Sequence, residues 1–129
     1  MIVLADTHAY HWWVTEPEVL SPPAGLALGA ADEIVVAAVT WFELAWLARR
    51  GRIGYRGSIE GWLHRISQDV RTLGLSPTIA ATAAGLPDSF PPDPADRLIF
   101  ATAIDHGLPI VSRDRRMQDH ASLAVKVIW

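Results

Sequence analysis

The chain has 129 residues, half of them hydrophobic, which is a typical length for one domain with a sizeable core and excludes a disordered chain. Eleven basic and fourteen acidic residues give a net charge of −3, so overall charge does not indicate nucleic-acid binding, although a local patch could provide it. The absence of cysteine excludes disulfide scaffolds, thiolate zinc sites and cysteine nucleophiles. We expect one domain over 1–129 in a cytoplasmic protein without membrane contact, because the sequence shows no signal peptide and no apolar run approaching about 18 residues.

Short apolar segments alternate with helical segments along the chain. The expected strands are 2–5, 34–37, 73–75, 108–112 and 125–128, and the expected helices start at residue 7 and span 18–28, 40–50, 59–71, 77–85 and 94–106. Thr40, Ser58 and Asp93 are the expected N-caps of three of these helices. This alternation predicts an α/β sandwich with a mainly parallel sheet, in which ligands bind at the carboxyl ends of the strands.

Three carboxylates are expected at that edge of the sheet. Asp6 follows the first strand, Asp114 follows the fourth, and Asp96 lies in the first turn of the helix between them. A fourth acid, Glu43, is the only charged residue over 34–48, in a helix apolar enough to be largely buried. A buried carboxylate needs a partner, a proton or a metal ion, and no basic residue lies within four positions of this one.

The aspartates also have a structural interpretation, because an aspartate at the start of a helix can cap it. A further aspartate, Asp93 ahead of Pro94, is best explained in this way. Together, however, converging carboxylates repel one another, and a hard divalent ion such as Mg²⁺ or Mn²⁺ removes that repulsion. Such ions polarise a phosphodiester and lower the pKa of a bound water. The residues therefore predict metal-assisted phosphodiester hydrolysis, without choosing the polymer.

The sequence resembles the PIN domain family, and more closely the VapC toxins of type II toxin–antitoxin systems, from residue 2 to about residue 128. The resemblance is carried in order by Asp6-Thr7-His8 after an apolar strand, by Glu43 in a Trp-rich helix, by D-P-A-D-R at 93–97 and by L-P-I-V-S-R-D at 108–114. It implies a PIN-like three-layer α/β/α sandwich with four to five strands, and an endoribonuclease that uses Mg²⁺ or Mn²⁺. The implied partners are substrate RNA and a cognate VapB-like antitoxin, and we also expect a homodimer.

The resemblance implies specific roles for the acids. The catalytic, metal-binding set is Asp6, Glu43, Asp96 and Asp114. Asp6 and Asp96 would be the principal ligands, Glu43 a ligand or the group that orients a metal-bound water, and Asp114 would complete the cluster directly or through water. Thr7 matches a supporting hydroxyl position, and Arg97 would brace the cluster or contact phosphate. Many relatives carry a histidine just before D-P-x-D-R, where this chain has Phe-Pro-Pro, so we assign no histidine a catalytic role.

Basic and aromatic residues suggest further surfaces. Residues 49–56 carry four arginines and no acid, so Arg49, Arg50 and Arg52, with Arg113 near the cluster, are candidate RNA contacts; a solvated helix end is the alternative. Part of the tryptophan surface near Trp12 would receive an antitoxin segment or a second copy, although core packing explains most of the six tryptophans. Two alternative functions remain open: a PIN domain that matures RNA, and a catalytically silent PIN-like binding module.

Overall fold

A parallel sheet forms the centre of the computed structural model, which describes residues 1–122 and 125–129. The strand order is β3-β2-β1-β4-β5, and every neighbouring pair is parallel. The strands are β1 (Ile2–Ala5), β2 (Glu33–Ala37), β3 (Arg71–Leu73), β4 (Ile110–Val111) and β5 (Val127–Ile128). The predicted α/β fold with a parallel sheet of up to five strands is confirmed.

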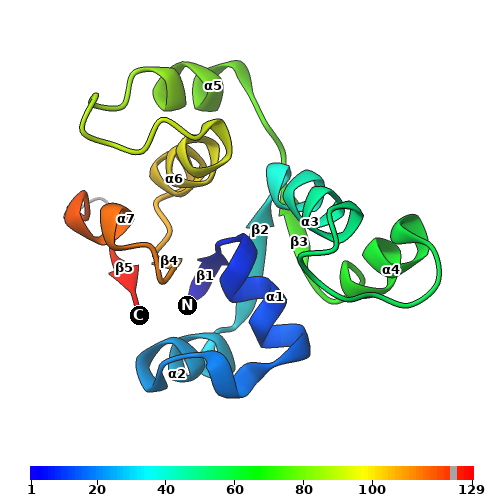
Figure 1. Ribbon diagram of the computed structural model, residues 1–129. Coiled ribbons are helices and arrows are strands. Elements are labelled where there is room, and N and C mark those ends of the chain that lie inside the picture. Colours follow the sequence, from blue (N-terminus) through cyan, green and yellow to red (C-terminus); the bar gives the residue numbers. More distant parts are fainter. Residues whose placement is uncertain (123–124) are drawn as a thin grey trace.

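Helices cover both faces of this sheet (Figure 1). They are α1 (Thr7–Thr15), the 3₁₀ turn η1 (Pro17–Val19), α2 (Pro22–Ala30), α3 (Val39–Arg49), α4 (Ile59–Ile66), α5 (Pro77–Ala84), α6 (Pro94–His106) and α7 (Arg115–Asp119). In Figure 1, α1 and α2 lie on one side, α5, α6 and α7 on the other, and α3 and α4 beside the β2–β3 edge. The three-layer arrangement is therefore also confirmed.

Two hydrophobic cores arise from the alternation of side chains along the strands. In β1, Leu4 packs in the core formed with α6, which includes Ile99 and Phe100. Its neighbours Val3 and Ala5 point to the opposite core, formed with α1 and α2. Burial on both faces explains why β1 is a continuous apolar run rather than an alternating one.

The start of α6 is fixed by local backbone chemistry. The Asp93 carboxylate accepts hydrogen bonds from the backbone N–H groups of Ala95 and Asp96, at 2.8 and 3.3 Å, and Pro94 stands at the first helical position. At the other end, Gly107 adopts a left-handed conformation with φ of 64°, which ends the helix. These caps place Asp96 in the first turn of α6, as predicted.

Four local predictions were wrong. Thr40 is not an N-cap: α3 begins one residue earlier, and the Thr40 side chain is fully buried. The expected helix over 18–28 is divided, because Ser21 caps a new helix that starts at Pro22. The helix that starts at Ile59 ends at Ile66, since the following residues lead into β3, an edge strand placed by pairing with β2 two residues before its predicted start.

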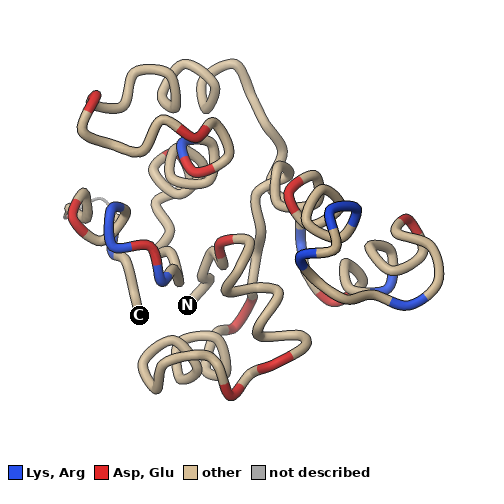
Figure 2. Tube along the Cα trace, viewed as in Figure 1, with Lys and Arg blue, Asp and Glu red and all other residues tan. Residues whose placement is uncertain are grey.

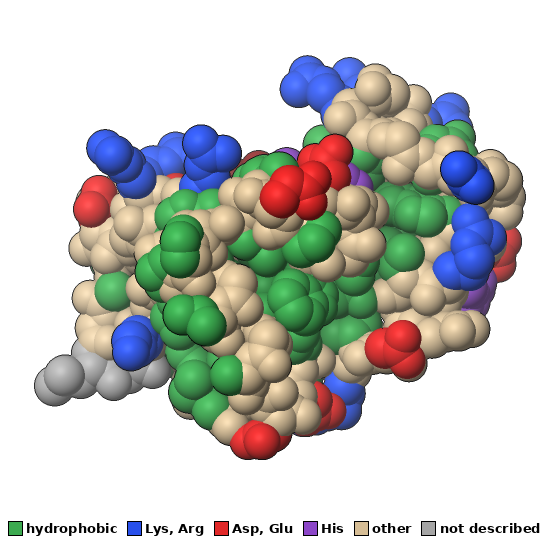
Figure 3. Space-filling model, turned by 90° about the horizontal axis from the view of Figure 1, so that it is seen from below, with side chains coloured by type: hydrophobic (Ala, Val, Ile, Leu, Met, Phe, Trp, Pro, Cys, Tyr) green, Lys and Arg blue, Asp and Glu red, His purple; other side chains and the backbone are tan. Residues whose placement is uncertain are grey.

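Apolar side chains gather on the surface formed by α1 and α2, which faces the viewer in Figure 3. The most exposed large one is Leu26, at 73% of its full accessibility. No helix in the described part of the chain combines the length and the apolar character needed to cross a membrane.

Candidate active site

The direction in which successive strands are added to the sheet changes between β1 and β4. The chain adds β2 and β3 on one side of β1, and β4 and β5 on the other. Asp6 directly follows β1, and Asp114 lies three residues beyond β4, so both stand at this switch point, where open α/β sheets bind ligands. Figure 2 shows acidic segments at the turn into α1, on α3, at the start of α6 and ahead of α7.

The other two predicted acids are brought in by α3 and α6, which pack against each other. The negative charges of Glu43, Asp114 and Asp6 all act on Asp96. The cluster is open: within residues 1–122 and 125–129, no three acidic or histidine side chains are close enough to hold one metal ion. The four predicted carboxylates thus share one electrostatic environment without forming a closed cage.

Asp6 is buried at the end of β1. Burial raises the pKa of this carboxyl above its ordinary value, and the charge of Asp114 raises it further. Hydrogen bonds from the Ser112 side chain and from the backbone N–H of Ala9, at 2.8 Å, oppose that rise. The bond from Ala9 makes Asp6 the N-cap of α1, so the capping and chemical interpretations of this residue are compatible.

Glu43 is held by a chain of two hydroxyl groups. The Thr7 hydroxyl donates to its carboxylate and also lies 3.1 Å from the Thr40 hydroxyl, which must donate in turn because Thr7 has only one proton. Burial raises the pKa of Glu43, the bond from Thr7 lowers it, and the charge of Asp93 raises it. Thr40 was missed as a site residue because a threonine ahead of an apolar helix is typical of an N-cap.

Asp96 combines burial with the charges of four other acids. Burial, followed by the charges of Asp93 and Glu43 and then those of Asp114 and Asp6, raises the pKa of its carboxyl to about 7. In the described ranges, its carboxyl accepts no hydrogen bond from the protein. A group in this position gains from either a proton or a cation.

Ser112 links Asp6 to Asp114. Its side chain is buried, hydrogen-bonds Asp6 and accepts a bond of 3.0 Å from the backbone N–H of Asp114. The Asp114 carboxylate accepts from the backbone N–H of Arg116 at 2.8 Å and thereby caps α7. Sequence reasoning missed Ser112, since a lone serine at a strand end carries no signal of its own.

Arg97 bonds backbone carbonyls rather than carboxylates. Its five N–H donors reach five carbonyl oxygens at 2.9 to 3.4 Å, which belong to Ala83, Leu86, Pro87, Phe90 and Pro91. The guanidinium therefore fastens the segment that connects α5 to the start of α6. Of its two expected roles, the geometry favours bracing, exerted through this segment, over contact with phosphate.

The predicted RNA-contacting arginines are exposed. They are Arg49, Arg50, Arg52 and Arg113. Arg50 lies over the Trp46 ring, with its guanidinium carbon 4.5 Å from the centroid, and Arg113 lies 5.9 Å from the Trp12 ring. Among the described residues, none of the four pairs with an acid. Their charges are therefore available to a ligand.

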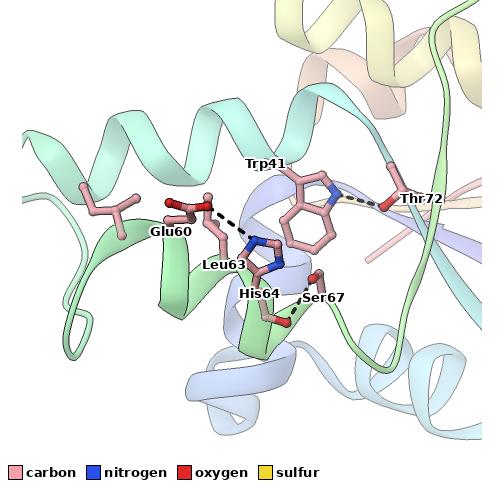
Figure 4. Close-up of a pocket in the computed structure, with 7 residues that line it drawn as sticks. Trp41, Glu60, Leu63, His64, Ser67 and Thr72 are labelled. Carbon is pink, nitrogen blue, oxygen red and sulfur yellow. Dashed lines mark hydrogen bonds and ion pairs between the residues drawn. The ribbon is translucent and has the colours of Figure 1, made fainter.

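Two hollows flank α3. A cavity of about 450 Å³ between α3 and the start of α6 is lined by Glu43 and Asp93 together with apolar side chains. The other hollow, between α3 and α4, is drawn in Figure 4: Trp41 donates to the Thr72 hydroxyl at 2.9 Å, and Glu60 lies 3.7 Å from His64. Only the first is continuous with the acidic cluster, so it is the candidate active-site cavity.

This arrangement matches a known family. Residues 3–123 match the model of the PIN domain, and the chain belongs to the PIN domain family. It is similar to ribonuclease VapC22 of Mycobacterium tuberculosis, with 50% identity over 127 residues that cover 98% of both chains. Among solved structures, it resembles VapBC2 of Rickettsia felis bound to promoter DNA, with a TM-score of 0.72 at 14% identity and full coverage of both chains. It also resembles a toxin–antitoxin complex from Klebsiella pneumoniae, with a TM-score of 0.67 at 22% identity, covering 95% and 94%.

Proposed function

We propose that this chain is a metal-dependent endoribonuclease that acts as the toxin of a type II toxin–antitoxin system. The observation that carries the proposal is the convergence of Asp6, Glu43, Asp96 and Asp114, from four separate elements, at the switch point of the sheet. Membership of the PIN family and the identity to a ribonuclease over nearly the whole chain support it. We take these four carboxylates as the catalytic set.

The donor set fits Mg²⁺ or Mn²⁺. All four donors are carboxylate oxygens, which hard divalent cations prefer, and the repulsion that raises the pKa of Asp96 is what a cation would relieve. When bound, such an ion polarises a phosphodiester and lowers the pKa of the attacking water. We assign Asp6 and Asp96 as the principal ligands. The protein contributes orientation: Thr7 holds Glu43, and Ser112 fixes Asp6 relative to Asp114.

The proposed partners are RNA, an antitoxin and a second copy of the chain. Arg49, Arg50, Arg52 and Arg113 would bind RNA phosphates, since their charges are exposed and unpaired with acids among the described residues. A small VapB-like antitoxin would keep the enzyme inactive in the cytoplasm; support comes from the toxin–antitoxin complex that the fold resembles. The homodimer remains a prediction, which sedimentation of the purified protein would check.

Cleavage of RNA should require both a divalent cation and Asp6. Asparagine caps helices about as well as aspartate, so Asp6→Asn keeps the bond from Ala9 while removing the charge. We expect cleavage in Mg²⁺ or Mn²⁺, none in chelator, and a loss of about 10²-fold or more in the variant. The matched control is Asp105→Asn, an exposed acid at the far end of α6, which should cleave normally.

Each other outcome of that assay favours a different function. Undiminished cleavage in chelator would contradict the metal-dependent mechanism. Binding of RNA without cleavage of any RNA tested would favour a catalytically silent module. Precise trimming of one precursor, unaffected by any antitoxin, would favour RNA maturation.

Removal of the Thr7 hydroxyl should slow cleavage by about tenfold or more, because a hydrogen bond to a charged carboxylate is worth about 1.5–3 kcal/mol. Thr7→Val tests this expectation, and Thr7→Ser, which keeps the donor, should restore the rate. Thr15→Val is the control, since that hydroxyl bonds only a backbone carbonyl at an exposed helix end. Equal rates for the valine and serine variants would show that the hydroxyl does not position Glu43.

A further inference from the structure

An exposed stack of three planar groups runs along α3. Phe42, Trp46 and Arg50 are four residues apart and therefore share one helix face. The two rings are stacked, with centroids 6.2 Å apart and planes 18° apart, and the guanidinium of Arg50 lies over the second ring. The two aromatic side chains retain 66% and 47% of their accessibility, so packing of the core does not explain them.

This stack borders the candidate active site. Phe42 and Trp46 line the cavity of about 450 Å³ that Glu43 and Asp93 also line. The volume lies within the range of about 300–1,000 Å³ typical of sites for small ligands. A ligand in this cavity touches Glu43 of the acidic cluster on one side and the aromatic face on the other.

The chemistry of the stack suits nucleobases. Aromatic and guanidinium planes bind bases by stacking, with little dependence on sequence, because every base offers a π-face. Arg49 and Arg50 add positive charge complementary to phosphates at the end of the same helix. In a duplex the base faces are already stacked on their neighbours, so a platform of this kind selects unpaired nucleotides.

We propose that Phe42, Trp46 and Arg50 form a base-stacking platform that holds an unpaired segment of substrate RNA beside the acidic cluster. This inference rests on the proposed function and deepens it, by assigning the face of α3 as the surface that binds the bases of the substrate.

Trp46 is the residue to change. The affinity of the full chain, carrying Asp96→Asn so that RNA stays intact in Mg²⁺, is measured by fluorescence anisotropy with a labelled, unpaired 15-nucleotide oligoadenylate. Two further ligands are the same oligomer with abasic central positions and the same oligomer in a duplex. Trp46→Ala removes the side chain, Trp46→Leu keeps apolar area without the π-face, and Trp46→Phe keeps the π-face.

We expect the alanine and leucine variants to bind the unpaired oligomer about tenfold or more weakly, and the phenylalanine variant to stay within about twofold. All variants should bind the abasic oligomer with similar, weaker affinity, and the duplex more weakly than the unpaired strand. Leucine binding as well as tryptophan, or an equal loss on the abasic oligomer, would overturn the proposal. So would a change from dimer to monomer in the variants at constant RNA affinity, which would assign this face to a second copy.

The two proposals fail in different ways. If the unmodified chain cleaves RNA and the Trp46 variants bind and cleave like it, the platform alone is wrong. If the unmodified chain cleaves no RNA while Trp46→Ala loses base-dependent binding, the nuclease is wrong and the platform stands.

Discussion

Replacement of Asp96 by asparagine is expected to reduce RNA cleavage by about 10²-fold or more and, without divalent cations, to raise the melting temperature at neutral to mildly alkaline pH. Both effects follow from the same charge. In the metal-free protein, the Asp96 carboxylate is partly buried among other acids, which raises its pKa to about 7. Asparagine has nearly the same shape without the charge, so the Asp96→Asn variant loses the proposed metal ligand and the charge repulsion together.

The pH dependence of this stabilisation has a definite sign. The carboxyl has an ordinary pKa of 3.8 when unfolded and about 7 when folded, so its ionisation opposes folding. Below about pH 4 the Asp96 carboxyl is protonated in both the folded and the unfolded state, so it does not affect the free energy of unfolding. The destabilisation grows as pH rises toward 7 and reaches its full size above that pH. Because the side chain is partly solvated, we expect a gain of only several degrees for Asp96→Asn near pH 8, shrinking toward pH 5.

Thermal unfolding in chelator and in Mg²⁺ measures both halves of this prediction. Mg²⁺ should stabilise the unmodified protein more than the variant, because binding to the folded state alone raises stability. Asp105→Asn should change neither melting temperature nor its dependence on Mg²⁺, since that acid is exposed. A lower melting temperature for Asp96→Asn in chelator near pH 8 would mean that the carboxylate stabilises the fold, as a purely structural acid would.

Replacement of Arg97 is expected to have the largest effect on stability. Arg97→Met leaves five backbone carbonyls without their donors. Hydrogen bonds from a charged donor are worth about 1.5–3 kcal/mol each, but part of the loss is recovered because water reaches some of these carbonyls. We expect a loss of about 2–4 kcal/mol in the free energy of unfolding, and a smaller one for Arg97→Lys, which can supply three donors.

Urea unfolding, compared with the cleavage rate at low temperature, distinguishes the two roles of Arg97. Arg56→Met, which removes an exposed arginine outside the proposed RNA contacts, is the control and should be within about 0.5 kcal/mol of the unmodified protein. Cleavage by the folded Arg97 variants should change little. A loss of cleavage of about 10²-fold at unchanged stability would instead show that the guanidinium binds phosphate.

The fold and the four acids follow from signals that are local in the sequence. The alternation of apolar runs with helices predicts the layers, and the position of Asp6 after a strand places it at the carboxyl edge. Glu43 was found because it is the one charge in a long apolar stretch. Each inference needed only the residue and its close neighbours, together with a general rule of α/β topology.

What could not be predicted depends on contacts between distant elements. The hydroxyl of Thr40 reaches Thr7 across 33 positions, and Ser112 joins two acids that stand far apart in the chain. Asp93 was correctly predicted as a cap, but its charge on Glu43 appears only when α3 and α6 are packed together. The stack on α3 has the spacing of an ordinary helix face, and only its exposure distinguishes it from core.

The pairing of β1 with β4 has a consequence for synthesis of the protein. Leu4 and Ala5 of β1 pair with Ile110 and Val111 of β4. More than a hundred further residues are therefore synthesised after β1 before β4, its second neighbour in the sheet, is present. Parallel pairing over such a separation forms late, because a long loop must close first. On the ribosome, a chain still short of β4 has Asp6 and Glu43 but not Asp114 or its anchor Ser112. The complete acidic cluster therefore forms only after Ser112 and Asp114 have left the exit tunnel, so that a product truncated before β4 carries no finished site.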